Sequence, residues 1–185
     1  MLYFVTENKQ KFDNAQIILK EYTLSLTQKP LPLVEIQSHS LEDIAKDKAR
    51  QAFALVKKPL VVKDDGWYIT ALNGFPGSYM KYTNEWLTPQ DFLNLLKPYT
   101  NREIIFRDAL YFTDGKKETC IVNTITGRII DSPKGKGVSS ATISTFRKDG
   151  KTMAECINEG LDFADKGVSI WHEFARWYNE MKSVK

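Results

Sequence analysis

Three polar residues near the start of the chain form the first pattern that could carry chemistry. Thr6, Asn8 and Lys11 stand between a predicted strand over 2–6 and helix-spaced apolar residues that begin at Phe12. A short polar side chain at such a junction caps the helix and leaves backbone N–H groups pointing outward, which makes a site for an anion. Lys11 lies about one turn into the helix and can reach the same anion. An ordinary cap followed by solvated lysines would have the same sequence, so both interpretations stay open.

Two adjacent carboxylates form the second pattern. Asp64 and Asp65 follow the apolar residues 60–62, and we expect them at a strand end, where open α/β sheets bind ligands. Burying carboxylates without compensation is costly, and a hard divalent cation is one compensation. Mg²⁺ typically takes only one or two protein carboxylates together with phosphate oxygens. Asp-Asp-Gly over 64–66 also suits a turn, so the pair is either a metal site or a strand-end turn.

Three further charged residues accompany segments that a ligand could approach. Glu35 lies in the mainly apolar, extended stretch 31–37 and is either an outward charge or a second metal carboxylate. Lys48 lies on the polar side of a predicted helix and is either solvated or turned toward a ligand. Lys81 follows a turn over 73–78 that contains two glycines and a proline, which lets backbone approach a ligand closely. A plain structural turn would look the same.

Several other catalytic patterns are missing from the sequence. His39 and His172 are far from each other and from Cys120 and Cys156, so zinc-ligand spacing is absent. The serines have no G-x-S-x-G context, which leaves an acyl-transfer serine without support. The G-x-G at 135–137 has no strand–turn–helix setting, so a dinucleotide fingerprint is not expected.

Composition limits the class of protein. The chain has 185 residues, of which 42% are hydrophobic and 12% aromatic, so it can bury a core and fits a single domain over 1–185. The net charge of +3 is too small to argue for nucleic-acid binding. No apolar run is long enough for a membrane span, and the start MLYFVTENK lacks a signal-peptide pattern. With only two distant cysteines, we expect a reduced, soluble protein of the cytoplasm.

The elements that must position these residues alternate between strand and helix. We expect strands at 2–6, 60–65, 102–114 and 118–130, an extended segment at 31–37, helices at 12–22, 40–56, 89–97 and 170–181, and a loop over 131–151. Asp114-Gly115 is a hairpin signal, so at least one strand pair is antiparallel. The expected fold class is therefore α/β, with a mixed central sheet and flanking helices.

Taken in order, these segments resemble the inosine triphosphate pyrophosphatase family, the house-cleaning purine nucleoside triphosphate pyrophosphatases. The resemblance spans nearly the whole chain and is most specific over the first 82 residues. It is carried by TENKQK (6–11), LPLVEIQ (31–37), IAKDKA (44–49), PLVVKDDG (59–66), ALNGFPGSYMKY (71–82), the TGR at 126–128 and the AE pair at 154–155.

The resemblance implies an enzyme that hydrolyses a nucleoside triphosphate between its α and β phosphates, giving monophosphate and pyrophosphate with Mg²⁺. It also implies two lobes around a nucleotide-binding cleft, a homodimer, and no nucleic-acid or membrane partner. The implied site residues are Thr6, Asn8 and Lys11 in the phosphate motif, Glu35 and Asp64 as metal carboxylates, Lys48, Lys81 and Lys166 as lysines near the substrate, and Asp65 beside it.

The implied mechanism is mostly electrostatic. The cation, the lysines and the helix N-terminus would neutralise the triphosphate and the charge that builds on the leaving pyrophosphate. A water activated by the cation or by a carboxylate would attack the α-phosphorus, with Asp64 or Asp65 as base. One carboxylate cannot easily be both a tight metal ligand and a free base, so the division of roles stays open. A nucleotide-binding or sensor protein without efficient catalysis is the alternative.

The chain departs from the family pattern in three places. Lys63 stands where the family usually has an acidic residue. Residues 137–142 replace a glycine–aromatic–aspartate loop that holds the base in the family. Ile170-Trp171 replaces the family's His-Arg pair. Trp171 either stacks on a base or packs in the core beside Phe174. Polar groups that would penalise a wrong base are missing, so we expect weak or shifted base preference with triphosphate chemistry retained.

Overall fold

The computed structural model describes residues 1–165 and 169–183. It divides into two compact units. Unit 1 is formed by the described residues of 1–64, 108–123 and 169–185, and unit 2 by those of 65–107 and 124–168. Lys166, the late lysine that the resemblance implies, lies outside the described residues.

The described strands form a seven-stranded mixed sheet, as the sequence predicts. Its order is β2-β1-β3-β5-β6-β7, and β4 pairs with β3. β1 is parallel to β2 and to β3, whereas β4 and β7 are antiparallel to their partners β3 and β6. The strands are β1 (Leu2–Phe4), β2 (Leu26–Gln28), β3 (Leu60–Ile69), β4 (Pro76–Gly77), β5 (Glu103–Thr113), β6 (Glu118–Ile129) and β7 (Ser144–Thr145).

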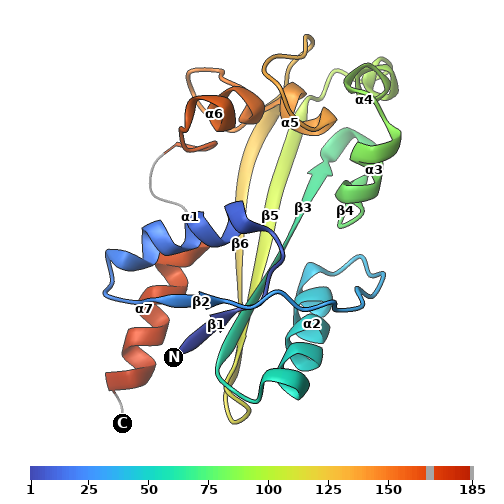
Figure 1. Cartoon of the computed structure of the whole chain (residues 1–185). Coiled ribbons are helices and arrows are strands. Elements are labelled where there is room, and N and C mark those ends of the chain that lie inside the picture. The colour runs from blue at the N-terminus through green and yellow to red at the C-terminus, as the bar shows by residue number, and fades with distance from the viewer. Residues whose placement is uncertain (166–168, 184–185) are drawn as a thin grey trace. The chain divides into compact units, whose positions relative to one another are not determined.

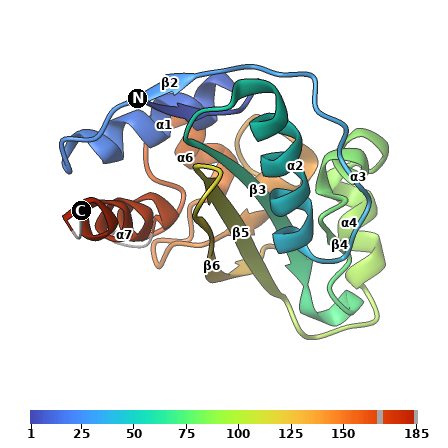
Figure 2. The ribbon, with the colours of Figure 1, turned by 90° about the horizontal axis from the view of Figure 1, so that it is seen from below.

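Unit 1 contains three helices that pack on its strands. They are α1 (Lys9–Lys20), α2 (Leu41–Val56) and α7 (Ile170–Ser183). Figure 2 shows α1 and α7 on one side of the strands and α2 on the other. Phe4, Val61 and Phe112 share a buried cluster with α1 and α7, while the neighbouring Leu60 and Val62 are also buried. Strand side chains alternate between the two faces, so both faces of these strands are covered.

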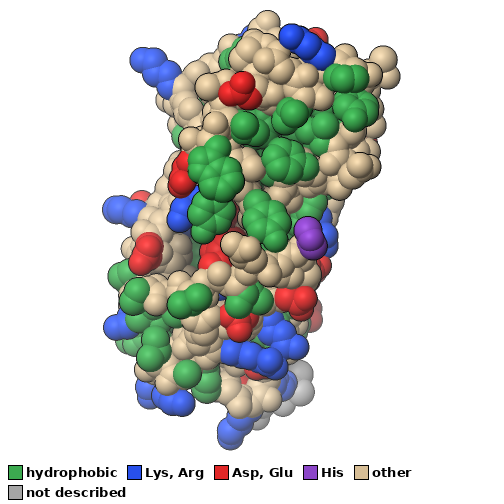
Figure 3. Space-filling view, turned by 90° about the vertical axis from the view of Figure 1, so that its right-hand side faces the viewer, with side chains coloured by type: hydrophobic (Ala, Val, Ile, Leu, Met, Phe, Trp, Pro, Cys, Tyr) green, Lys and Arg blue, Asp and Glu red, His purple; other side chains and the backbone are tan. Residues whose placement is uncertain are grey.

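Unit 2 carries four short α-helices and one 3₁₀ turn at Thr70–Leu72. The helices are α3 (Met80–Trp86), α4 (Pro89–Leu96), α5 (Ser139–Ile143) and α6 (Met153–Glu159), and α5 packs against α4 and α6 (Figure 1). The core of the unit includes Phe92, Phe106 and Phe146. Figure 3 shows hydrophobic side chains gathered on the surface. In α3 the exposed rings of Tyr82 and Trp86 stack, with their centroids 5.8 Å apart.

The hairpin between β5 and β6 confirms the Asp114-Gly115 signal. The Asp114 amide donates to the Lys117 carbonyl at 3.2 Å, and the Asp114 carboxylate accepts from the amides of Lys116 and Lys117. Gly115 has φ +86°, and a Cβ there would overlap the ring of Phe53. A side chain at this position is therefore excluded by both backbone conformation and space.

The structure differs from the predicted elements in two places. Residues 31–37 lie outside the sheet, and its edge strand is β2, which the sequence pattern did not predict. The predicted loop over 131–151 contains α5 and β7. Two of its hydroxyl groups bond to nearby backbone, since Thr142 Oγ1 donates to the Ser139 carbonyl and Ser144 Oγ donates to the Ser140 carbonyl. Such bonds from side chain to backbone help a Ser- and Thr-rich segment to be buried as a short helix and a two-residue strand.

Candidate functional site

The motif Thr6, Asn8, Lys11 builds the N-terminus of α1. Thr6 Oγ1 accepts a hydrogen bond from the Asn8 amide at 3.1 Å, and Asn8 Oδ1 accepts one from the Lys11 amide at 3.0 Å. Asn8 is thus the N-cap, as predicted. The first amides of a helix have no acceptor within the helix, and the helix dipole adds positive potential at this end. The arrangement suits an anion whose oxygens approach the start of α1.

Glu35, Lys48 and Asp64 form an ion-pair cluster in unit 1, which we call the Lys48 cluster. Lys48 Nζ lies 2.5 Å from Glu35 Oε2 and 2.8 Å from Asp64 Oδ2. The side chains of Lys48, Glu35 and Asp64 are 18%, 44% and 14% exposed. The cluster brings together the two residues that the resemblance implies as metal carboxylates. Glu35 is therefore neither a member of a strand nor a lone outward charge.

Lys48 does not lie on the polar side of its helix, which corrects the prediction. It is four residues after Ile44 and four before Ala52, and both of these are buried on the stripe of α2 that faces the strands. Ser40 caps this helix by accepting a hydrogen bond from the Asp43 amide at 3.0 Å. A lysine on the buried stripe needs a negative partner at the end of its side chain, and the two carboxylates supply it.

The loop that carries Glu35 is tied to α2 by Gln51. The Gln51 side-chain amide donates to the Val34 carbonyl at 2.7 Å, and its oxygen accepts from the Val34 amide at 3.1 Å. Gln51 is one helical turn beyond Lys48. The same helix, α2, therefore holds the loop of Glu35 through Gln51 and supplies the Lys48 ammonium that pairs with Glu35. The Gln51 contact holds the segment 31–37, which lies outside the sheet, against α2.

The carboxylates of Asp64 and Glu35 both raise the pKa of Lys48. Burial of the side chain works to lower the pKa of Lys48, but the charge of Asp64 and the hydrogen bonds to Asp64 and Glu35 outweigh it. The pKa of Lys48 therefore lies above its ordinary value, and the side chain is an ammonium ion at neutral pH.

Asp64 and Asp65 lie inside β3 and not at its end, because the strand continues to Ile69 and pairs with β4. Asp64 shares a strand face with Leu60 and Val62, toward α2. Asp65, the next residue, points to the other face and belongs to unit 2. The sequence placed the acids correctly in a strand but ended that strand four residues too early.

Lys63 forms a second ion pair on the face that Asp64 does not use. Its Nζ lies 3.2 Å from Asp108 Oδ2, and the two side chains are only 11% and 7% exposed. The register pairs Phe4 with Val61, and continuing it places Thr6 beside Lys63 on the α1 face. The sequence pattern missed Asp108, because β5 also carries Glu103 and Arg107 and nothing local distinguishes Asp108 as the buried charge.

Lys81 belongs to unit 2 and lies near the start of α3. It is exposed, and its Nζ lies 5.9 Å from the centre of the Tyr82 ring. The preceding turn includes Gly77 at φ +60°, a conformation that favours glycine. The turn that the sequence predicted before Lys81 is therefore present.

The residues that replace the family's base-binding groups are mostly buried. Trp171 is 4% exposed and meets the Phe4 ring edge-on at 4.9 Å, and it also packs against Phe174. Ile170 and the α5 residues 140–142 are buried as well. Of the two roles considered for Trp171, packing in the core is the correct one.

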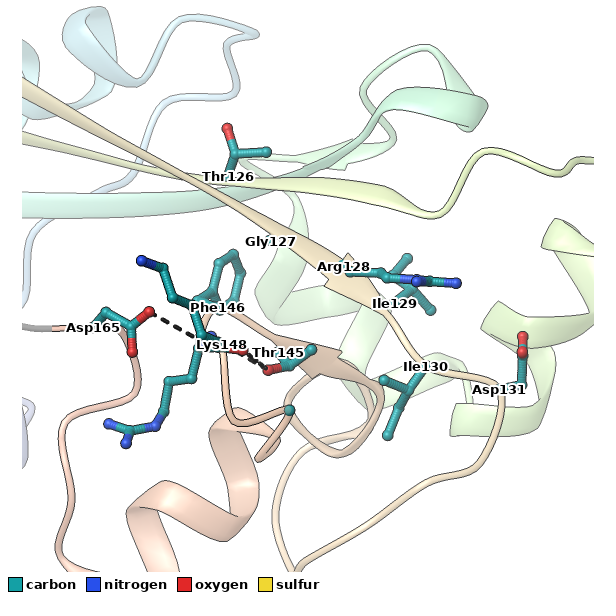
Figure 4. A pocket seen from close by; sticks show the side chains of 12 residues that line it. Thr126, Gly127, Arg128, Ile129, Ile130, Asp131, Thr145, Phe146, Lys148 and Asp165 are labelled. Atoms are coloured by element: carbon teal, nitrogen blue, oxygen red, sulfur yellow. Dashed lines mark hydrogen bonds between the residues drawn. The ribbon is translucent and has the colours of Figure 1, made fainter.

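An open pocket of about 650 Å³ lies in unit 2 (Figure 4). Its lining includes Arg128, Phe146, Lys148 and Asp165, and the Lys148 amide donates to Asp165 Oδ2 at 3.2 Å. A Cβ at Gly127 would overlap the Phe146 ring, which explains the glycine of the TGR sequence. None of the residues predicted for the site lines this pocket.

The metal-binding capacity of the described residues is limited. Within 1–165 and 169–183, no three His, Cys, Asp or Glu side chains gather closely enough to hold a metal ion by themselves. Glu35 and Asp64 converge on a single positive charge, and two carboxylates are the usual protein share of a Mg²⁺ site that is completed by phosphate. The donor set therefore fits Mg²⁺ together with a phosphorylated ligand.

Within residues 1–165 and 169–183, no helix is long and apolar enough to cross a membrane.

Comparison with known proteins agrees with these features. A dITP/XTP pyrophosphatase from Methanopyrus kandleri is 32% identical over 178 residues, which cover 95% of this chain and 94% of that protein. An inosine triphosphate pyrophosphatase from Tuber melanosporum is 31% identical over 175 residues, covering 94% and 90%.

The fold and the family model agree as well. The solved structure of a HAM1 protein from Coxiella burnetii superposes with a TM-score of 0.81 and 20% identity, covering 97% of this chain and 98% of that one, so the two share the α/β fold. The model of the Ham1 family matches residues 2–159. The resemblance drawn from the sequence motifs is confirmed, and the chain belongs to the Ham1 family.

Proposed function

We propose that the protein is a nucleoside triphosphate pyrophosphatase that releases pyrophosphate and leaves a nucleoside monophosphate. Relatives that align with nearly the whole chain are named dITP/XTP or inosine triphosphate pyrophosphatases. The observation that carries the proposal is the convergence of Glu35 and Asp64 on one positive charge, Lys48. A site that concentrates carboxylates and lysine in this way suits a metal-bound polyphosphate.

Phosphate binding is assigned to the start of α1 and to lysines. Thr6 and Asn8 shape the helix terminus so that its amides face an anion, and Lys11 adds a charge to it. Lys48 supplies a second charge once it leaves its carboxylates. From the resemblance, Lys81 is proposed as a further phosphate ligand and Lys166 as a further substrate ligand. Together these groups stabilise the charge that develops on the leaving pyrophosphate.

Glu35 and Asp64 would hold Mg²⁺. The ion would supply positive charge that neutralises the triphosphate and the leaving group. Because Asp64 is then a metal ligand, we assign the role of base to Asp65, the adjacent carboxylate that the resemblance places beside the substrate. Asp65 accepts a proton from a water whose oxygen bonds to the α-phosphorus, and the bond from that phosphorus to the bridging oxygen breaks to release pyrophosphate.

Base selectivity is proposed to be weak or shifted. Trp171 packs in the core beside Phe4, so it is not available to stack on a base. Discrimination between bases depends largely on site polar groups that a wrong base leaves unpaired, and the family's His-Arg pair is absent here. From the resemblance we also propose a cytoplasmic homodimer.

A panel of inosine, xanthosine, guanosine, adenosine, cytidine and uridine triphosphates tests the proposal. With Mg²⁺ present we expect pyrophosphate and monophosphate as products, and a chelator should abolish both. Chromatography of the nucleotides distinguishes this cleavage from release of inorganic phosphate, which would leave a diphosphate. Tight binding of triphosphates without any hydrolysis would instead support the nucleotide-binding alternative, which the rewritten base-binding segments favour.

A further inference from the structure

The Lys48 cluster holds a cation before any metal is present. Lys48 Nζ contacts Glu35 Oε2 at 2.5 Å and Asp64 Oδ2 at 2.8 Å, so both oxygens lie within hydrogen-bond distance of one atom. Lys48 and Asp64 are both largely buried, which means that water screens the attraction only weakly. The lysine therefore lies between the two carboxylates that the proposed function assigns to the metal.

An ammonium ion and a metal ion cannot share this position. Mg²⁺ binds oxygens at about 2.0–2.1 Å, so an ion held by the same two oxygens would fill much of the space between them that Nζ now occupies. The two carboxylates carry two negative charges, which one ammonium partly neutralises and one divalent ion neutralises fully. Adding the metal without moving Lys48 would place three positive charges beside two negative ones.

The surroundings let the side chain leave while the carboxylates stay. Gln51 binds the backbone of Val34 and keeps the loop of Glu35 on α2, and Asp64 is fixed within β3. Lysine has a flexible four-carbon stem, so its charged end can swing without movement of the helix. The cluster is thus a pair of carboxylates on anchored backbone with a movable cation.

We propose that Lys48 is a built-in competitor of the metal, and that its displacement turns it toward the substrate's phosphates. This inference rests on the proposed function, because it takes Glu35 and Asp64 as the metal ligands. Without nucleotide, the metal must displace the ammonium and binds weakly. A triphosphate gives the displaced Lys48 a new partner, so metal and triphosphate each strengthen the binding of the other. The free protein thereby avoids holding a tightly bound metal without its substrate.

Metal binding by the nucleotide-free protein tests the competition. We would titrate Mn²⁺, a paramagnetic substitute for Mg²⁺, into wild type and Lys48→Met and count the free ion by electron paramagnetic resonance. Lys48→Met keeps the length of the side chain and removes its charge, and it should bind Mn²⁺ at least ~10-fold more tightly, which is about 1.4 kcal/mol. Lys46→Met removes a charge from the same helix outside the cluster and should change the affinity less than ~3-fold. Equal or weaker binding by Lys48→Met would overturn the proposal.

A second measurement uses the wild-type protein and does not depend on the folding of a variant. Reductive methylation at fixed pH, read by mass spectrometry, reports how accessible each lysine amine is. Mn²⁺ should increase the methylation rate of Lys48 several-fold and leave that of Lys46 unchanged. No increase at a saturating metal concentration would also overturn the proposal.

The variants Glu35→Gln and Asp64→Asn separate this inference from the proposed function. If both weaken Mn²⁺ binding but Lys48→Met does not strengthen it, the metal site stands and the competition is wrong. If neither weakens it, the ion binds elsewhere, and both the assigned metal site and the competition are wrong.

Discussion

Lys63 and Asp108 join β3 to β5 through an ion pair of 3.2 Å that is almost fully removed from solvent. Lys63 precedes Asp64 in the strand, yet its side chain points to the opposite face, toward α1. The basic residue at a position that is usually acidic in the family is thus matched by an acid on the neighbouring strand. The pair supports β3 from the face opposite the Lys48 cluster.

Removing one partner of the Lys63–Asp108 ion pair should lower the free energy of unfolding. Asp108→Leu leaves the Lys63 ammonium buried without its carboxylate, and we expect a loss of about 3–5 kcal/mol in the free energy of unfolding. Urea denaturation measures it. The double variant Lys63→Met/Asp108→Leu removes both charges and should recover most of the loss. A double variant as unstable as the single one would contradict the assignment of the loss to a buried charge.

Asp64→Asn should keep the fold and nearly abolish turnover. The amide retains the shape of the carboxylate but lacks the charge that attracts the metal, so we expect kcat to fall by several orders of magnitude. Pyrophosphate release at saturating substrate and Mg²⁺ gives kcat, and circular dichroism checks the fold. Near-normal turnover would remove Asp64 from the mechanism.

Lys11→Ala should weaken all triphosphates by a similar factor. Its position in the first turns of α1 predicts a contact with phosphate and not with base, and a charge-assisted contact of about 1.5–3 kcal/mol corresponds to ~10-fold or more in affinity. Dissociation constants for purine and pyrimidine triphosphates check this, with Lys20→Ala at the other end of α1 as a matched control. A loss confined to one base would argue against the assignment.

Trp171→Phe should change stability but not base selectivity. The smaller ring loses part of the edge-on contact with Phe4 and leaves a cavity in the core, which we expect to cost roughly 1–3 kcal/mol. The ratios of kcat/KM across the triphosphate panel should stay within ~2-fold of wild type, because the ring does not touch substrate. A selective loss for purines would show that Trp171 contacts the base.

Tyr111 predicts how stability changes at alkaline pH. Burial and the hydrogen bond to Glu118, at 2.7 Å, raise the pKa of Tyr111 to about 12. A tyrosine in the unfolded chain has a pKa of about 10. The stabilisation of the folded state by protonated Tyr111 is therefore complete below a pH of about 10 and is lost as the pH rises toward 12. Denaturation series between pH 8 and 12 on wild type and Tyr111→Phe should show a steeper alkaline decline in wild type. Parallel declines would contradict the prediction.

The amino-acid sequence by itself determined the local elements and the cap at the start of α1. Helix α4 begins where Thr88 and Asp91 form a capping box with Pro89 at the start of the helix, and the β5–β6 hairpin turns at Asp114-Gly115. Asn8 caps α1 as its position predicts. These features depend on residues within a few positions of one another, so periodicity, caps and turn residues are sufficient to find them.

Only the tertiary structure decided which charges meet. Lys48 belongs to the buried stripe of α2 because Glu35 and Asp64 neutralise it, although a lysine in a helix ordinarily indicates a solvated face. The partner of Lys63 is 45 residues away in the sequence, on a strand whose register no local pattern fixes. Such pairs depend on strand order and register, because electrostatic attraction between buried charges follows distance in space and not separation along the chain.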